Sequence, residues 1–316
     1  MVPPLRHPLR FDRSRLGEGL LALAVWLLVI ASTLGADVAA AESAAPRLIS
    51  LNPSLTSIIV RLGGGASLVG IDDYSAQVVP EVAELPRVGG LFDPSLEAVV
   101  ALEPDRVLIV AGVDQEGHAA RLTRTGVAVD IYQNQTLDQV FENIDRLGAL
   151  LDRNAEAAER VREIRAMQAA VKAATTGRVG PSAVVVVDRS PLYLVGRGTF
   201  LDEMLEAVGA RNLVRTLAPG YPRGSVEWLI AARPDLILDM TPGSSDAQAF
   251  WGRWPSLPAV AKERVLSVEA GRISLPGPDL DTAIRELAVL VHGEEIAGAI
   301  AAALASSGEA HAEAAR

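Results

Sequence analysis

The chain has 316 residues, of which 49% are hydrophobic and 22% are charged, and it contains no cysteine. The lack of cysteine excludes a disulfide framework, a thiolate metal site and an acylated cysteine. The net charge of −10 argues against a nucleic-acid partner. A chain of this length can form two globular domains with hydrophobic cores.

The first 41 residues have the order of a secretory signal peptide. Four arginines within residues 6–15 precede the apolar stretch Leu20–Leu34, and Ala39–Ala41 offers small residues for cleavage. An uncleaved membrane anchor is the alternative, but the apolar stretch is shorter than the roughly 20 residues that a spanning helix needs. We therefore predict export to the periplasm and removal of residues 1–41, by cleavage after Ala41 or nearby.

Short apolar runs alternate with helical patterns along the rest of the chain. Strands are predicted at 47–51, 68–71, 106–110, 126–131 and 183–188. Helices are predicted at 55–62, 94–101, 137–151, 199–208 and 279–292. Asp93 is expected to cap the second of these helices, with Pro94 at its first position. This alternation predicts a mostly parallel α/β arrangement.

One segment is repeated. Residues 94–110 read PSLEAVVALEPDRVLIV and residues 224–240 read GSVEWLIAARPDLILDM. Glu97 aligns with Glu227 and Pro104 with Pro234, so each copy reads as a short helix, a Pro-Asp turn and a buried strand. A repeat this far apart predicts two similar lobes, and small ligands bind in clefts between lobes.

The predicted fold class is α/β, with two similar lobes whose sheets are mostly parallel, one long rigid helix between them and a ligand cleft. A helical pattern after residue 152, with Asn154 as a possible cap, supplies the connecting helix. A single helix permits only a small rocking motion of the lobes. The expected organisation is a signal peptide (1–41), an N-terminal lobe (42–152), an inter-lobe helix (153–175), a C-terminal lobe (176–305) and a flexible tail (306–316).

The mature chain resembles the helix-linked periplasmic binding proteins of ABC importers for cobalamin, ferric siderophores and haem, and is most similar to the cobalamin branch. The matching stretches are RLISLNPSLTSIIVRLGGGASLVGIDDYS (47–75), LPRVGGLFDPSLEAVVALEPDRVLIV (85–110), LVGRGTFLDEMLEAVGARNLV (194–214) and GSVEWLIAARPDLIL (224–238). The resemblance implies that Glu97 and Glu227 dock against arginines of the membrane permease. The residues alone allow a simpler role, in which each acid stabilises the first turn of its helix.

The resemblance also implies a set of ligand contacts. Aromatic positions of the cobalamin branch match Tyr74, Tyr193 and Tyr221, and a fourth falls at Leu91 or Phe92, of which we take Phe92. That branch usually has tryptophan at two of the four. Alternatively, the tyrosines in these loops contact no ligand and only cover the hydrophobic core. The family often places an arginine near the last helix, and Arg272 is the candidate for it, although the acids Asp279 and Asp281 follow.

We expect a non-enzymatic receptor with no catalytic residue, no metal site and no cofactor. Its partners would be an ABC permease dimer with its ATPase and a bulky solute, preferably cobalamin or another corrinoid. A ferric siderophore and haem are the alternatives within this class. An enzyme or a ligand sensor on the same two-lobed fold is the alternative outside it. Gly196-x-Gly198 lacks the third glycine of a dinucleotide loop, and four histidines are too few for a zinc receptor.

Overall fold

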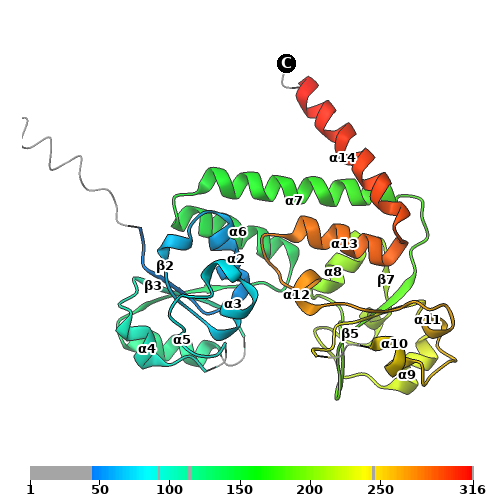
Figure 1. The fold of residues 1–316 in the computed structure, drawn as a ribbon, viewed down its shortest axis with the longest axis horizontal. Coiled ribbons are helices and arrows are strands. Elements are labelled where there is room, and N and C mark those ends of the chain that lie inside the picture. The colour runs from blue at the N-terminus through cyan, green and yellow to red at the C-terminus, as the bar shows by residue number, and fades with distance from the viewer. Residues whose placement is uncertain (1–44, 92, 113–114, 244–245, 315–316) are drawn as a thin grey trace, which may run out of the picture. The chain divides into compact units, whose positions relative to one another are not determined.

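The computed structural model describes residues 45–91, 93–112, 115–243 and 246–314, without the side chains at 115–116, 270, 272 and 308–314. The predicted signal peptide therefore lies outside the described residues. Each of the two lobes is built on its own sheet, and α7 (Asn154–Thr175) connects them. Figure 1 shows α7 passing alongside the elements of both lobes.

The first lobe contains β1 (Leu48–Ser50), α2 (Pro53–Arg61), η1 (Gly65–Ser67), β2 (Leu68–Ile71), α3 (Asp73–Val78), η2 (Pro80–Val82), α4 (Leu96–Ala101), β3 (Arg106–Val110), α5 (Gln115–Arg124), β4 (Ala128–Tyr132) and α6 (Leu137–Leu150). The second contains β5 (Ser182–Arg189), β6 (Leu192–Leu194), α8 (Phe200–Ala207), β7 (Arg211–Asn212), η3 (Leu213–Thr216), α9 (Val226–Ala232), β8 (Leu236–Asp239), α10 (Ala247–Trp251), α11 (Pro258–Ala261), β9 (Val265–Ser267), α12 (Ala270–Ile273), α13 (Leu280–His292) and α14 (Glu295–Ala314).

Both sheets are mostly parallel. Among the described residues the first has the strand order β2-β1-β3-β4, with every pairing parallel. The second has the order β6-β5-β8-β9, with β7 beside β5, and only the β5–β6 hairpin pairs antiparallel. The predicted α/β class with two similar lobes is confirmed. In such sheets ligands bind beyond the carboxyl ends of the strands.

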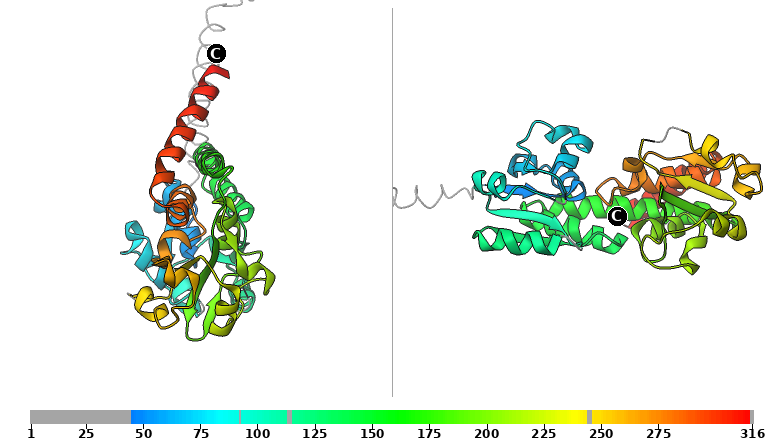
Figure 2. Two further views of the ribbon diagram at one scale, coloured as in Figure 1. Left: turned by 90° about the vertical axis from the view of Figure 1, so that its right-hand side faces the viewer. Right: turned by 90° about the horizontal axis from the view of Figure 1, so that it is seen from below.

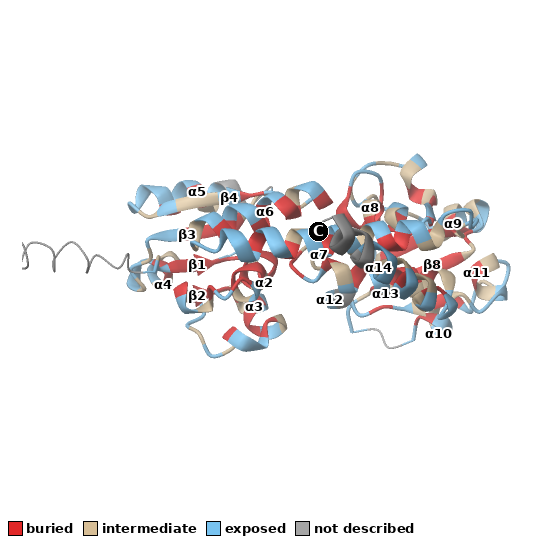
Figure 3. Cartoon of the chain, turned by 90° about the horizontal axis from the view of Figure 1, so that it is seen from above, coloured by how far each residue is buried: buried red, intermediate tan, exposed pale blue. Residues whose placement is uncertain are grey.

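The strands are apolar on both faces because each sheet lies between two layers of helices. Along β5, Ala183 and Val185 belong to the main core, whereas Val184 and Val186 face a second core with α9, α10 and α11. The main core continues from the first lobe through α6, α7 and α13 into the second lobe. Figure 3 shows the buried residues along the strands of both lobes. A core shared through α7 resists bending between the lobes.

Several boundaries differ from the sequence predictions. The helix expected to start at Pro94 with Asp93 as cap starts at Leu96 instead, and the Ser95 hydroxyl accepts the Ala98 N–H at 3.2 Å. Pro94 forms a bridge with Gly89, which keeps it extended. The cap predicted at Asn154 is also wrong, because Asn154 is already helical and the capping position holds Arg153.

The C-terminal helix α14 packs on α7 and then runs beyond it (Figure 2). The sequence predicts a flexible tail at 306–316, and in the structure the helix continues through this segment to Ala314. The flexibility of the tail stays a prediction. Within the described residues, none of the helices combines the length and the apolar character that crossing a membrane requires.

Candidate functional site

The repeated segments place one exposed glutamate at the same point of each lobe. Glu97 and Glu227 lie in the first turns of α4 and α9, and both are exposed. Ser95 and Ser225 cap these helices by accepting the N–H three residues on, at 3.2 Å in both cases. Hydrogen bonds from its own backbone N–H and from Ser225 lower the pKa of Glu227, so the carboxylate is charged at neutral pH. Figure 1 shows α4 and α9 in corresponding places, away from α7.

The aspartates that follow the repeated prolines fix the strands of each lobe. The Arg47 N–H donates to the Asp105 carboxylate at 2.7 Å, and the Ser182 hydroxyl donates to Asp235 at 2.6 Å. The N–H groups of Asp105 and Asp235 in turn donate to the carbonyls of Arg47 and Ser182, at 2.8 Å and 2.9 Å. The repeat thus has a structural function in both lobes, independent of any docking role of its glutamates.

A cavity of about 610 Å³ opens where strands of both lobes end. Its lining comes from the segment after β3, the segment after β4, the loop before α8, the segment before α9 and the segment after α12. The residues are Ala111, Asn134, Gln135, Arg197, Gly198, Thr199, Phe200, Pro219, Gly220, Tyr221, Ser274 and Pro276. We call it the strand-end cavity. Its volume lies within the range of small-ligand pockets, about 300–1,000 Å³.

Tyr221 is the sequence-predicted residue that the structure places in this cavity. It is 53% exposed, and desolvation by the surrounding loops raises the pKa of its phenol. The phenol therefore stays neutral at ordinary pH and presents both a ring and a hydroxyl to a ligand.

The other two tyrosines that the sequence predicts as ligand contacts do not line the cavity. Tyr74, in the first turn of α3, and Tyr193, in β6, are 42% and 40% exposed. Their exposure shows that neither serves to fill the core. Phe92 lies outside the described residues, and so does the side chain of Arg272, whose backbone belongs to α12. The contacts expected of all four residues stay predictions.

A buried polar network holds the start of α3, which carries Tyr74. The fully buried Asp72 carboxylate accepts the N–H groups of Tyr74 and Ser75, both at 2.9 Å, and the Ser75 hydroxyl. Thr56 contacts the hydroxyls of Ser75 and Ser50 at 2.9 Å and 2.8 Å. Desolvation raises the pKa of Asp72, against the lowering effect of these hydrogen bonds.

The two acids near the last helix do not face the strand-end cavity. Asp281 accepts a hydrogen bond from Arg160 of α7, and Asp279 lies 3.9 Å from both Arg61 and Arg160. The sequence left open whether these acids face the ligand. Because each lies near an arginine and neither lines the cavity, they do not give the cavity a negative charge.

Sequence reasoning missed the polar lining of the cavity. Asn134 and Gln135 follow β4 directly, and Arg197 and Thr199 lie in the loop between β6 and α8. The signal that could have found Asn134 and Gln135 is their place after the predicted strand at 126–131, because ligands bind at strand carboxyl ends. The strand before Arg197 and Thr199, β6, was not predicted. No group of three or more His, Cys, Asp or Glu in the described part of the chain could hold a metal ion.

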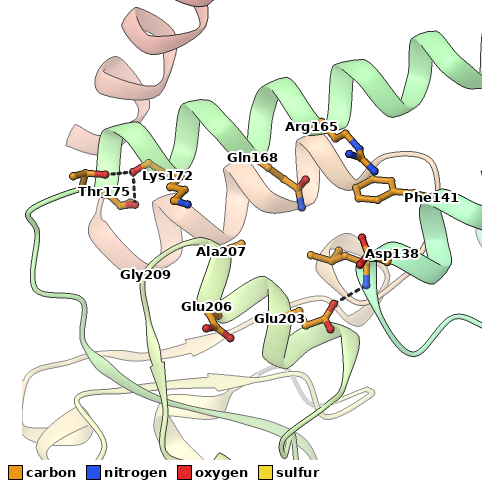
Figure 4. Close-up of a pocket in the computed structure, with 12 residues that line it drawn as sticks. Asp138, Phe141, Arg165, Gln168, Lys172, Thr175, Glu203, Glu206, Ala207 and Gly209 are labelled. Carbon is orange, nitrogen blue, oxygen red and sulfur yellow. Dashed lines mark hydrogen bonds between the residues drawn. The ribbon is translucent and has the colours of Figure 1, made fainter.

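A second hollow, of about 660 Å³, lies among α6, α7 and α8 (Figure 4). Charged side chains of both signs line it, including Arg165, Lys172, Glu203 and Glu206. Across it the Leu137 N–H at the start of α6 donates to the Glu203 carboxylate at 2.7 Å. Helix surfaces rather than strand ends form this hollow, so we take the strand-end cavity as the candidate ligand site.

Known proteins agree with this architecture. A curated vitamin B12-binding protein of Vibrio parahaemolyticus is 26% identical over 242 residues, which cover 76% of this chain and 87% of the relative. A crystal structure of a periplasmic heme binding protein from Pseudomonas aeruginosa matches with a TM-score of 0.68 and 25% identity, covering 79% of this chain and 94% of that one.

The periplasmic vitamin B12 binding protein of Vibrio cholerae shares the fold, with a TM-score of 0.64 and 23% identity over 82% of this chain and 98% of its own. The family model described as "Periplasmic binding protein" matches residues 48–270, which include β1 to β9 and both copies of the repeat. This chain therefore belongs to the periplasmic binding protein family.

Proposed function

We propose that this protein is a periplasmic receptor that delivers a bulky metal-chelate solute, preferably a corrinoid, to an ABC importer. The observation that carries the proposal is the strand-end cavity, lined from both lobes and containing the exposed ring of Tyr221. Aromatic rings grip large planar ligands, each contact contributing about 1 kcal/mol beyond area burial. The curated relatives named as vitamin B12-binding proteins support a corrinoid.

Haem is the second candidate. A neighbour of similar fold is described as a heme binding protein, and a tyrosine such as Tyr221 is a group that can ligate haem iron. A ferric siderophore is the third candidate. Tyr74, Phe92, Tyr193 and Arg272 stay proposed contacts beside Tyr221. We do not expect catalysis, because binding and release of the solute need no chemical step.

Calorimetry with cyanocobalamin, haemin and a ferric hydroxamate ranks the three candidates. We expect cyanocobalamin to bind at micromolar protein, and Tyr221→Ala to weaken it about tenfold. Leu217→Ala is the control, since Leu217 is 41% exposed nearby without lining the cavity. If only the hydroxamate or haemin titrates, the corrinoid assignment is wrong and the receptor assignment stands. If none of the three binds, delivery of a metal chelate is wrong.

The proposed docking to a permease dimer rests on Glu97 and Glu227. Two exposed carboxylates at matching points of the two lobes fit a two-fold partner that presents arginines. Reversing both charges with Glu97→Arg and Glu227→Arg should abolish uptake by cells, because like charges then face each other. Affinity for the solute in solution should stay the same.

The matched control reverses two exposed glutamates elsewhere, Glu142→Arg on α6 and Glu294→Arg after α13. This control should retain uptake. Equal loss of uptake in both double variants would show that net charge alone matters. Loss of solute binding in solution by the Glu97 and Glu227 variant would place these residues in the ligand site, contrary to the docking proposal.

A further inference from the structure

Arg197 gives the strand-end cavity a positive charge. The described lining of the cavity includes Arg197 and neutral polar groups such as Asn134 and Thr199, but no aspartate or glutamate. The chain as a whole carries 39 acidic residues and a net charge of −10. Within the described lining, a ligand that acids would repel meets a favourable charge.

The backbone around Arg197 is held in place on both sides. The Arg197 N–H donates to the Ala218 carbonyl at 3.2 Å, and the Gly220 N–H donates to the Arg197 carbonyl at 3.0 Å. At Gly196, a Cβ atom would come within 2.3 Å of the Ala218 carbonyl oxygen, so only glycine allows this approach. These contacts fix the position of the Arg197 backbone. The Arg197 side chain is exposed.

Arg197 has no charged partner among the residues that the structure describes. Among the described residues its guanidinium forms neither an ion pair nor a side-chain hydrogen bond, whereas Arg215 nearby pairs with Glu206 at 2.5 Å. The closest acid in sequence, Asp202, is 2% exposed and accepts hydrogen bonds from the Gly198 N–H and the Asn212 amide. Asp202 also lies 3.5 Å from Arg215, which offsets part of its charge.

The start of a helix that carries Asp202 and Glu203 in its first turn borders the same cavity. Helix α8 starts beside it, where Thr199 caps the helix by accepting the Asp202 N–H at 3.2 Å. The N-terminal end of a helix carries a partial positive charge. The acids of its first turn offset this partial charge, so the guanidinium of Arg197 is the positive group of the described lining.

We infer that Arg197 binds an anionic group of the solute, either a phosphodiester or a carboxylate. A guanidinium matches both groups with two parallel hydrogen bonds, and charge-assisted bonds of this kind are the strong ones. This inference rests on the proposed function, from which it takes the class of solute. It adds that the group of the solute recognised by Arg197 is negatively charged. It assigns no role to Arg197 in docking to the permease.

The test compares wild type, Arg197→Gln and Arg197→Lys against probes that differ in charged groups. Cyanocobalamin carries a phosphodiester, haemin carries carboxylates, and dicyanocobinamide is a corrinoid without the phosphodiester. Arg197→Gln should weaken the probe with the recognised anion at least about tenfold and leave dicyanocobinamide unchanged. Arg197→Lys should recover part of the lost affinity, because lysine keeps the positive charge but cannot donate two parallel hydrogen bonds. Arg211→Gln, an exposed arginine of the same lobe outside the cavity, should change nothing.

A selective loss for cyanocobalamin identifies a phosphodiester, and a selective loss for haemin identifies a carboxylate. An equal loss for all probes, or no loss for any, overturns the inference. If no chelate binds wild type, the proposed function fails, and NMR of the arginine side chains decides the inference separately. Inorganic phosphate should then shift the Arg197 Nε resonance and not that of Arg211, and equal shifts or none would overturn it.

Discussion

Replacing Arg160 with methionine should cost the protein about 3 kcal/mol of unfolding free energy, at the lower end of the range for breaking a buried ion pair. The Arg160 side chain lies on α7 and is 6% exposed. Its Nε donates to the Pro278 carbonyl at 2.6 Å, and its two terminal nitrogens donate to Glu163 and Asp281. Arg160 thus ties the connecting helix to the segment that enters α13.

Methionine keeps most of the volume but leaves the Pro278 carbonyl and the Asp281 carboxylate without their donor. Asp281 is 22% exposed and can still reach water, which places the loss near the lower end of the range. Urea unfolding followed by circular dichroism measures the change. Adding Asp281→Asn to Arg160→Met should restore part of the stability, because the unpaired charge is then gone.

Arg162→Met is the matched control on the same helix. Its ion pair with Glu159 is exposed, with side-chain exposures of 64% and 58%, so the loss should stay below about 1 kcal/mol. If Arg160→Met and Arg162→Met lose equally little, the contacts of Arg160 do not stabilise the joint between α7 and α13, and our reasoning about that joint fails.

Two further predictions concern the other buried or bridging acids. The raised pKa of Asp72 means that the folded state binds a proton more tightly, so its contribution to stability should fall as pH rises from about 4 through the raised value. Asp72→Asn should flatten that dependence in unfolding measurements, and an unchanged slope would contradict the assignment. Glu203→Ala should speed hydrogen exchange at the Leu137 amide, which loses its acceptor. Glu206→Ala should not, and equal effects would show that the bridge is unimportant.

Much of the fold could be predicted because its signals are local and periodic. The runs Leu48–Ser50 and Ser182–Arg189 are apolar on both faces, which is typical of parallel strands between helices. The long helix after residue 152 lacks proline, and its observed range is Asn154–Thr175. The repeat correctly predicted that Glu97 and Glu227 lie at equivalent points, because each follows a serine cap by two residues.

Contacts between distant segments could not be predicted in the same way. Arg160 meets Pro278 and Asp281 across more than a hundred residues, and nothing in its own helix distinguishes it from Arg162. The strand-end cavity likewise joins Asn134 of one lobe to Arg197 and Tyr221 of the other. Periodicity identifies the strand that each segment follows, but packing decides which segments meet. Tyr221 is the residue named by the family resemblance that lines this cavity, and its contact with a ligand stays a prediction.

The acidity of the protein does not oppose an anionic solute at the strand-end cavity. At physiological salt, charges in solvent are screened over about 8 Å, so the net charge of −10 acts weakly on a ligand that has entered. The charged groups nearest to the cavity therefore decide the sign of its electrostatic potential. Asp279 and Asp281 lie near the guanidinium of Arg160, Asp202 lies near that of Arg215, and Arg197 remains for the ligand. The pairing of these acids with arginines leaves Arg197 as the charged group of the described lining.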